Sequence, residues 1–425
     1  MVVARIAAGR EADLRALLAS MNSAPGVADP QNALLPFGKF ERLHFARFVI
    51  PEDATTVDYA VLGLPIPQYP PQLVFMGDCD GDASEVLADI AKRAAPGLSR
   101  IFSHCDGFEM DGDLADWLAA RDVPVQANYV NWLGRTVTQV KEENALQRFL
   151  SAKVTRESLR TGAQIQQYRR ELVSAVQAEV QAGHLSLTPD SATPLAWRLR
   201  DLTHLLGVPL LGLLASPLLL VLSPWLVYEL RKREQSDPEI YPHPNADALQ
   251  VLREQEDREV SNQFSALGSL KPGRFRRWLV IVILLLIDYA SRHVFNRGHL
   301  GRVRTIHFAR WVFIDDKARI IFASNYDGGH EAYMDDFINK VAWGLNLVFS
   351  NGIGWPRTDW LIKRGARLEQ RFKYYQRRHQ IPSQVWYKAY PGLTALDMIR
   401  NHRIRAGLER AEMTDGEVLV WLRLL

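Results

Sequence analysis

The sequence predicts an α+β fold: an internally duplicated α+β barrel with a membrane-associated helical hairpin inserted between its two repeats. Three observations lead to this prediction. Two distant stretches of the chain are similar, both alternate strand-type and helix-type segments in the same order, and a long apolar run without charge lies between them. Mainly antiparallel strands with helices gathered on one face are typical of the α+β class. Two such sheets facing each other are expected to form a closed or nearly closed barrel.

The duplication rests on matches in one register. Residues 43–50 (LHFARFVI) match residues 306–313 (IHFARWVF), and residues 73–108 match residues 320–355 without a gap. The match resumes between residues 124–136 and 382–394. Identical residues include Phe75/Phe322, Asp80/Asp327, Gly81/Gly328, Gly97/Gly344 and Thr136/Thr394. This is a domain duplication, because solenoid repeats recur every 20 to 50 residues or so.

The expected organisation has four parts. Residues 1–38 form an N-terminal helix, over residues 4–21, and a linker. Residues 39–154 form the first α+β repeat and residues 305–425 the second. Residues 155–304 form a helical insertion with membrane segments at 205–228 and 278–290. Within it we expect a charged helix over residues 156–181 and, over residues 236–266, an exposed loop followed by a helix.

Each repeat is expected to contain the same elements in the same order. Alternation and aromatic residues predict strands in the first repeat, and apolar residues at helical spacing predict helices. The expected strands cover residues 40–50, 72–76, 98–103 and 123–132, and the expected helices cover residues 82–95, 113–121 and 137–154.

The apolar run at 205–228 carries no charge. At about 1.5 Å per residue it is long enough to cross a hydrocarbon core of roughly 30 Å. A buried core hairpin is the alternative, because Pro209, Pro217 and Pro224 would each interrupt a regular helix. The second run, 278–287, is about half the length that a span requires. The residues expected to contact lipid are Leu205, Leu210, Leu218, Trp225, Trp278 and Leu284.

Basic residues flank both apolar runs on both sides, which contradicts a simple crossing. Two related repeats that pack together must also lie on the same side of a membrane. A proline-broken hairpin that dips into one leaflet satisfies both conditions. Two true spans, the second lengthened to residue 290, are the alternative. The flanking arginines would suit anionic lipid headgroups.

The composition limits the classes of function. Of the 425 residues, 47% are hydrophobic and 23% are charged, which is ordinary for globular domains. The net charge of +3 is too small to indicate nucleic acid. The N-terminus lacks the apolar core of a signal peptide, so we expect a membrane-associated protein with its soluble domains on the cytoplasmic face. Cys79 and Cys105 match Tyr326 and Gly352 of the other repeat, which argues against a shared thiol chemistry.

His44 and His307 occupy equal positions, each three residues before an arginine, Arg47 or Arg310. Odd spacing on a strand places His and Arg on opposite faces. One interpretation has a histidine binding a metal or haem inside the barrel, and the other has it hydrogen-bonded to a neighbouring strand.

Asp80-Gly81 and Asp327-Gly328 close a strand and open a helix. The aspartates are expected to cap the helices, and the glycines to adopt positive φ. A distal haem acid is the alternative role for the aspartate. His330, Glu331, Asp335 and Asp336 form an acidic cluster, but no His-x-x-x-His or His-Glu-x-x-His occurs and no metal site is predicted.

The duplicated halves, together with the strand-ending sequence Gly77-Asp78-Cys79-Asp80-Gly81, resemble the ferredoxin-like dimeric α+β-barrel superfamily, and distantly its dye-decolourising peroxidases. That family carries a G-x-x-D-G motif whose Asp lies on the distal side of haem. The resemblance implies Asp80, Asp327 and Arg310 as catalytic residues and His330 or His307 as haem ligands. The second repeat, Ser324 to Gly328, lacks the first glycine. The chain also resembles an uncharacterised bacterial membrane-associated family with H-F-A-R-W and S-N-Y-D-G segments, which implies no activity.

Two functions follow as hypotheses. The first is a membrane-associated, non-catalytic scaffold or lipid-binding protein that self-assembles, with the lipid bilayer and further copies of itself as partners. Repeated residues that are mostly glycines, aromatics and caps favour it, because a fold needs these types. The alternative is a haem-dependent, peroxidase-like enzyme that acts on an apolar or lipid substrate.

Overall fold

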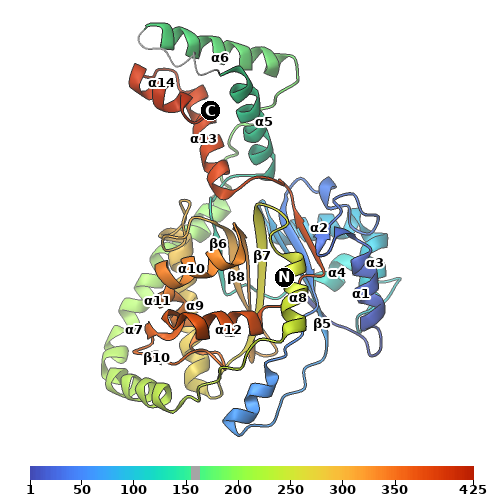
Figure 1. Cartoon of the computed structure of the whole chain (residues 1–425), viewed down its shortest axis with the longest axis vertical. Helices are drawn as coiled ribbons and strands as arrows, with labels where there is room; N and C mark the ends of the chain where they lie inside the picture. Colours follow the sequence, from blue (N-terminus) through green and yellow to red (C-terminus); the bar gives the residue numbers. More distant parts are fainter. Residues whose placement is uncertain (155–162) are drawn as a thin grey trace. The chain divides into compact units, whose positions relative to one another are not determined.

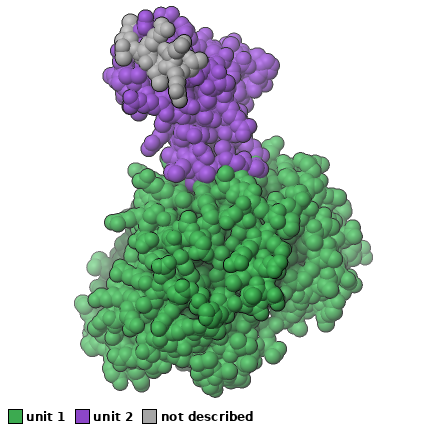
Figure 2. All heavy atoms as spheres, in the orientation of Figure 1, with its two compact units in different colours: residues 1–133, 193–389 green, residues 134–192, 390–425 purple. Residues whose placement is uncertain are grey.

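The computed structural model describes residues 1–154 and 163–425. These form two compact units, shown in Figure 2. The first unit comprises Met1–Leu133 and Thr193–Ala389, and the second comprises Gly134–Ala192 and Tyr390–Leu425. The α+β class is confirmed, while the division into four parts stays a prediction.

The first unit contains two main sheets (Figure 1). One has six strands in the order β1-β5-β4-β12-β3-β2, and the other has four in the order β6-β8-β9-β7. The strand bounds are β1 Val2–Arg5, β2 Asn22–Ala24, β3 Val27–Ala28, β4 Leu43–Val49, β5 Gln72–Cys79, β6 Ala127–Val130, β7 Ser261–Ser269, β8 Ile306–Ile314, β9 Arg319–Asp327 and β12 Val385–Lys388. The first sheet is mixed because β12 and β3 run parallel. Neither sheet closes on itself in the described chain, so the expected closed barrel is wrong.

Matching residues of the two sequence stretches take the same strand partners. β4 pairs with β12 through Phe48 and Val385, and β8 pairs with β6 through the equivalent residues Trp311 and Ala127. At the opposite edges of the two sheets, the matching residues Phe75 and Phe322 also pair with edge strands: Phe75 pairs with Val2 of β1, and Phe322 pairs with Ala266 of β7. Each sheet therefore takes one strand, β6 or β12, from the other sequence stretch.

Helices cover the outer faces of the sheets in the first unit (Figure 1). Their bounds are α1 Glu11–Ala19, α2 Ala83–Arg93, α3 Ala95–Phe102, α4 Leu114–Ala119, α7 Leu195–Ser236, α8 Ala246–Gln255, α9 Arg274–His293, α10 His330–Lys340, α11 Ala342–Phe349 and α12 Glu369–His379. The core beneath α9, α10 and α11 includes Phe264, Trp311, Phe322 and Phe337. A second cluster, including Val74, Met76 and Ile321, has residues from β4, β5, β7, β8 and β9 and joins the two sheets.

Two expected elements differ from the structure, and one strand was not expected. Residues 98–103 belong to helix α3, because Leu98, Ile101 and Phe102 are spaced to bury one helical face. The expected N-terminal helix is strand β1 followed by the shorter α1, since Val2 and Ala4 alternate inward as edge residues. Strand β7, which begins within residues 236–266 and ends at Ser269, was missed because it is buried along its whole length and shows no alternation.

Helix α7 runs unbroken from Leu195 to Ser236 with Pro209, Pro217 and Pro224 inside it. The expected proline-broken hairpin is therefore wrong. Each proline removes one backbone hydrogen bond and bends the helix without ending it. Figure 1 shows α7 curving along the outside of the unit.

The second unit is a small helical domain. Its helices are α5 Val137–Lys153, α6 Ala163–Gln181, α13 Ala395–Glu409 and α14 Asp415–Leu422. Leu146, Leu150, Ile404 and Trp421 share its core. Capping boxes at Thr136 and Thr394 start α5 and α13 at matching positions of the two repeats. Of the helix expected over residues 156–181, residues 156–162 lie outside the described residues.

Candidate functional site

The two repeated histidines are each hydrogen-bonded to the repeated aspartate at the end of the adjoining strand. His44 Nε2 lies 2.8 Å from Asp80 Oδ1, and His307 Nε2 lies 2.6 Å from Asp327 Oδ1. Both histidines sit where a β-bulge shifts the strand register, which re-aims the side chain. The ring of His44 packs against Phe308, and that of His307 against Phe45. The hydrogen-bonded interpretation of these histidines therefore describes the geometry.

The sequence predicted that these two aspartates cap helices, and this prediction is wrong. Asp82 caps α2 by accepting from the backbone N–H groups of Ser84 and Glu85, and Gly329 is the residue before α10. Gly81 and Gly328 adopt φ values of 77° and 84°, as expected. These left-handed residues place the aspartates before the turn, where they meet the histidines instead.

A second polar cluster lies between the two sheets, and sequence reasoning found only its arginines. Arg310 donates to Asp78 and to the Gly77 carbonyl, 2.9 Å away. Arg47, at the matching position, donates to Asn325 and to the Ser324 carbonyl, 3.0 Å away. Asn325 in turn donates to Asp78 at 3.0 Å. One carboxylate thus stands among two buried guanidinium groups.

Burial sets the electrostatics of this cluster. It lowers the pKa of Arg47 to about 10, while Asp78 opposes that shift. The sequence could have pointed to Asp78 and Asn325, because these two residues occupy matching positions of the two repeats, on the strands next to those that carry the matching arginines. Two buried arginines at equal positions require acceptors at equal positions.

The residues proposed as a haem site do not fit that group. The cavity between the sheets is about 10 Å³, lined by Phe45, Asp78, Phe308 and Arg310 among others. This is room for about one water molecule, whereas cofactor pockets measure roughly 300–1,000 Å³. His307 is already hydrogen-bonded to Asp327. His330 packs beside Phe264 and is only 3% exposed to solvent.

His330 opens helix α10 as a buried, neutral side chain. Within the described part of the chain, neither ring nitrogen has a hydrogen-bond partner. Burial is the main cause that lowers the pKa of His330 to about 4, and Arg377 adds to the effect. In the unfolded chain the pKa is about 6.5.

We expect His330 to make the protein acid-sensitive. As the pH falls from about 6.5 towards 4, the unfolded chain gains a proton that the folded chain does not, so stability falls, by about 3 kcal/mol at the limit. His330→Met removes this group at similar volume. Denaturation measured at neutral and acidic pH should show a smaller loss for the variant. Equal losses in both proteins would contradict the assignment.

The outer surface of α7 carries many exposed apolar side chains. Leu214 is 71% exposed and Val221 is 77% exposed. By length and composition α7 is suited to cross a membrane, and none of its most apolar 18-residue stretch is buried. Of the predicted lipid contacts, Leu205, Leu210, Leu218, Trp225 and Trp278 are exposed. Leu284 is not: it is 1% exposed, because it lies on the α9 face packed against the core.

The N-terminal half of α7 is fastened to α9. His204 Nδ1 lies 2.9 Å from His293 Nε2, and His204 Nε2 lies 3.5 Å from Asp288 Oδ2. Tyr289 donates to the Leu205 carbonyl. Asp288 also pairs with Arg292 at 2.9 Å and accepts from the backbone of Asn128 in β6.

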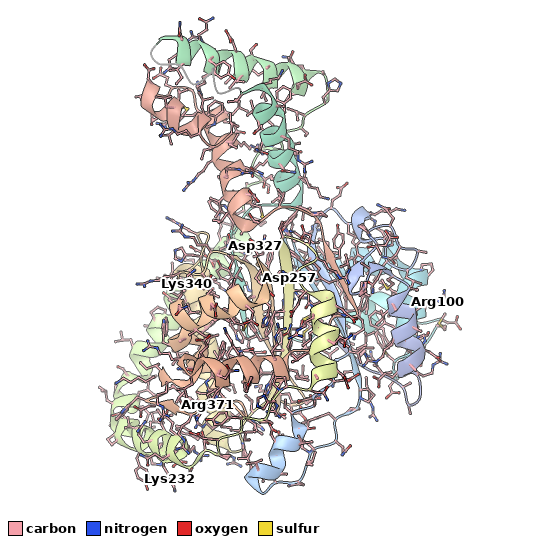
Figure 3. The ribbon with its side chains drawn as sticks, viewed as in Figure 1. Arg100, Lys232, Asp257, Asp327, Lys340 and Arg371 are labelled. Carbon is pink, nitrogen blue, oxygen red and sulfur yellow. The ribbon has the colours of Figure 1, made fainter. Side chains whose placement is uncertain are left out.

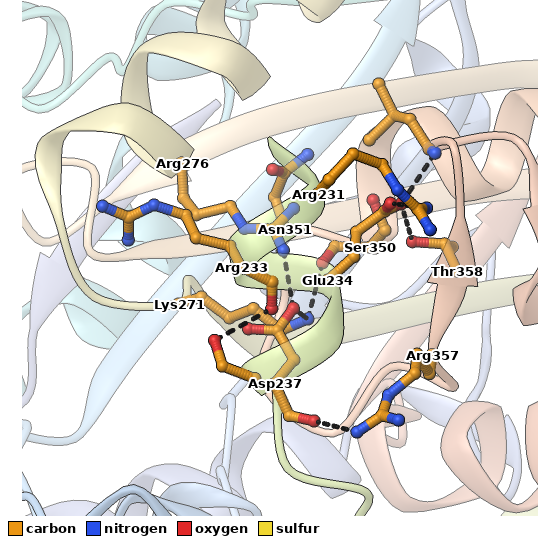
Figure 4. Close-up of polar contacts among 12 residues, drawn as sticks. Arg231, Arg233, Glu234, Asp237, Lys271, Arg276, Ser350, Asn351, Arg357 and Thr358 are labelled. Carbon is orange, nitrogen blue, oxygen red and sulfur yellow. Dashed lines mark hydrogen bonds and ion pairs between the residues drawn. The ribbon is translucent and has the colours of Figure 1, made fainter. Parts of the chain in front are cut away.

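The C-terminal end of α7 is fastened by two acids that sequence reasoning missed (Figure 4). The buried Glu234 accepts from the Thr358 hydroxyl at 2.9 Å. Asp237 pairs with Lys271 at 2.7 Å and with Arg276 at 2.6 Å. Burial lowers the pKa of Lys271 to about 8 although Asp237 raises it. The N-terminal half and the C-terminal end of α7 are thus held by the same unit.

No family model, curated protein or solved structure matches this chain.

Proposed function

We propose that the protein attaches to a membrane surface through α7, which lies in the plane of one leaflet. The exposure of its most apolar stretch supports this proposal most directly. Soluble proteins rarely expose continuous apolar patches of this kind unless the patch meets a membrane or a partner.

An in-plane position fits the anchoring of α7 better than a crossing. The helix has 42 residues and is therefore roughly 60 Å long. A crossing would place its two ends on opposite sides of the bilayer. Because His204 and Glu234 bind the same folded unit, we assign α7 to the interface, as in monotopic proteins.

We further propose that the two repeats are duplicated ferredoxin-like halves. The matched registers of β4 with β12 and of β8 with β6 support this proposal. In this view the halves stay together because each contributes a strand to the other's sheet. The shared residues then serve the fold, which favours a non-catalytic scaffold over a peroxidase.

The proposed role is a self-assembling or lipid-holding scaffold on the cytoplasmic leaflet. Anionic lipids concentrate in that leaflet and attract basic residues. The haem alternative is not favoured, because the intersheet cavity of about 10 Å³ is far too small for it. Light scattering of the detergent-solubilised protein measures the assembly state.

Membrane attachment can be tested by vesicle flotation. Leu214→Glu with Val221→Glu places two carboxylates on the exposed face of α7. Each leucine-sized side chain contributes about 1.5–3 kcal/mol when buried, so we expect the partition coefficient to fall at least about 100-fold.

The matched control replaces two apolar residues of similar exposure outside α7. Leu396 is 52% exposed and Val420 is 61% exposed. Leu396→Glu with Val420→Glu should leave flotation unchanged. If the original protein fails to float with any vesicle, the proposed function is wrong.

A further inference from the structure

A short hairpin beside the end of α7 carries apolar side chains into solvent. Strands β10 (Thr358–Asp359) and β11 (Lys363–Arg364) pair with each other and leave three residues at the tip. Trp360 is 50% exposed and Ile362 is 42% exposed. Trp360 and Leu361 also adopt positive φ, which is costly for residues of this type. Leu361 packs against the core of the unit, but core packing does not explain the exposure of Trp360 and Ile362 on either side of it.

The end of α7 holds this tip in place. The carboxylate of Glu234 accepts from the backbone N–H of Trp360 at 3.1 Å and of Leu361 at 2.7 Å. Arg231 pairs with Asp359 and lies over the Trp360 ring at 4.7 Å. The exposed tip therefore has a fixed position next to the apolar helix.

The start of α9 adjoins the same region. The ring of Phe275 lies 6.1 Å from that of Trp225 on α7. Trp278, one turn further along α9, is 66% exposed. Exposed tryptophans thus occur on α7, on α9 beside it and on the hairpin tip held by Arg231. Tryptophan is enriched at this level of membrane proteins, between headgroups and acyl chains.

Basic residues accompany these tryptophans. Lys232, Arg274 and Arg277 are exposed, and the described chain supplies no ion pair for any of them. Figure 3 shows Lys232 at the edge of the unit. Arg274 and Arg277 lie in the first turns of α9, where the helix dipole disfavours positive charge. An external anion there would relieve this repulsion and bind the free N–H groups of the helix start.

We infer that the β10–β11 tip and the start of α9 form a second membrane contact, which takes the headgroups of an anionic phospholipid bilayer. This inference rests on the proposed attachment through α7 and adds its orientation and lipid class. The tip inserts Trp360 and Ile362 beside Trp278, while Lys232, Arg274 and Arg277 meet the phosphates. The charge complementarity of unpaired cations with anionic lipid identifies the bilayer as the occupant.

The test compares flotation on phosphatidylcholine vesicles with and without phosphatidylglycerol. Lys232→Glu, Arg274→Glu and Arg277→Glu, combined, should lower the partition coefficient on the anionic vesicles by about 100-fold, since each basic residue near the surface contributes about fivefold. Partition on pure phosphatidylcholine should change little. Trp360→Ser with Ile362→Ser should lower partition on both kinds of vesicle.

The control reverses the charge of three exposed basic residues elsewhere in the same unit, for an equal change in net charge: Arg10→Glu, Arg100→Glu and Lys317→Glu. Figure 3 shows Arg100 on the opposite side of the unit from Lys232. If both triple variants lose the anionic preference equally, or neither does, the inference is overturned while attachment through α7 stands. If the original protein forms dimers and floats with no vesicle, a second copy covers this face and both proposals fail. Circular dichroism checks that each variant folds.

Discussion

Asp78→Asn is expected to lower the free energy of unfolding of the first unit by about 3–5 kcal/mol. Asp78 is the carboxylate that accepts from Arg310, and its other oxygen accepts from Asn325 at 3.0 Å. Asparagine keeps the shape and one carbonyl oxygen but removes the charge. Arg47 and Arg310 would then remain buried with no negative charge between them, since within the described chain Arg310 pairs with Asp78 alone and Arg47 forms no ion pair.

Chemical denaturation of the detergent-solubilised protein, followed by tryptophan fluorescence, measures this effect. Asp89→Asn is the matched control, because Asp89 pairs with Arg93 at 3.0 Å on an exposed face of α2. An exposed pair at this helical spacing contributes about 0.3–0.5 kcal/mol. Similar losses in the two variants would show that the buried charge of Asp78 is not what holds the sheets together.

The sequence was sufficient for the elements whose patterns are local. Strands β4 and β5, helices α2 and α5, and the positive φ of Gly81 and Gly328 follow from alternation, helical spacing and glycine. The exchange of β6 and β12 between sheets was not predictable, because it depends on pairing between residues far apart in sequence. The misassigned α3 shows the same limit, since a short apolar run is compatible with a buried strand or helix.

The residues of the candidate site could likewise be predicted where a local pattern marks them, and not where distant segments meet. The matching positions of His44 with Asp80 and of His307 with Asp327 were visible in the sequence, but the bonds between them were not. In the sequence, Glu234 is one of several charged residues that follow the apolar run. It is buried because the β10–β11 hairpin folds back over the end of α7, which no local pattern records.

Gly97→Ala is expected to destabilise the first unit by about 3 kcal/mol or more, at the upper end of overpacking costs. A Cβ at this position would lie 1.8 Å from the Leu34 carbonyl oxygen. That atom belongs to the backbone, so no side-chain rotation can relieve the clash. Gly97 is also buried at the start of α3, and the loop that carries Leu34 would have to move away.

Gly344 provides the internal control, because it holds the matching position in the second repeat, on α11. Apart from its chain neighbours and the backbone of its own helix, no atom of the described residues would lie within 4 Å of a Cβ there. Gly344→Ala should therefore stabilise the protein by about 0.5–1 kcal/mol, through the higher helix propensity of alanine. The two variants should shift the denaturation midpoint in opposite directions. Equal shifts would mean that the close approach of Leu34 to α3 is absent in solution, since the two substitutions differ mainly in that contact.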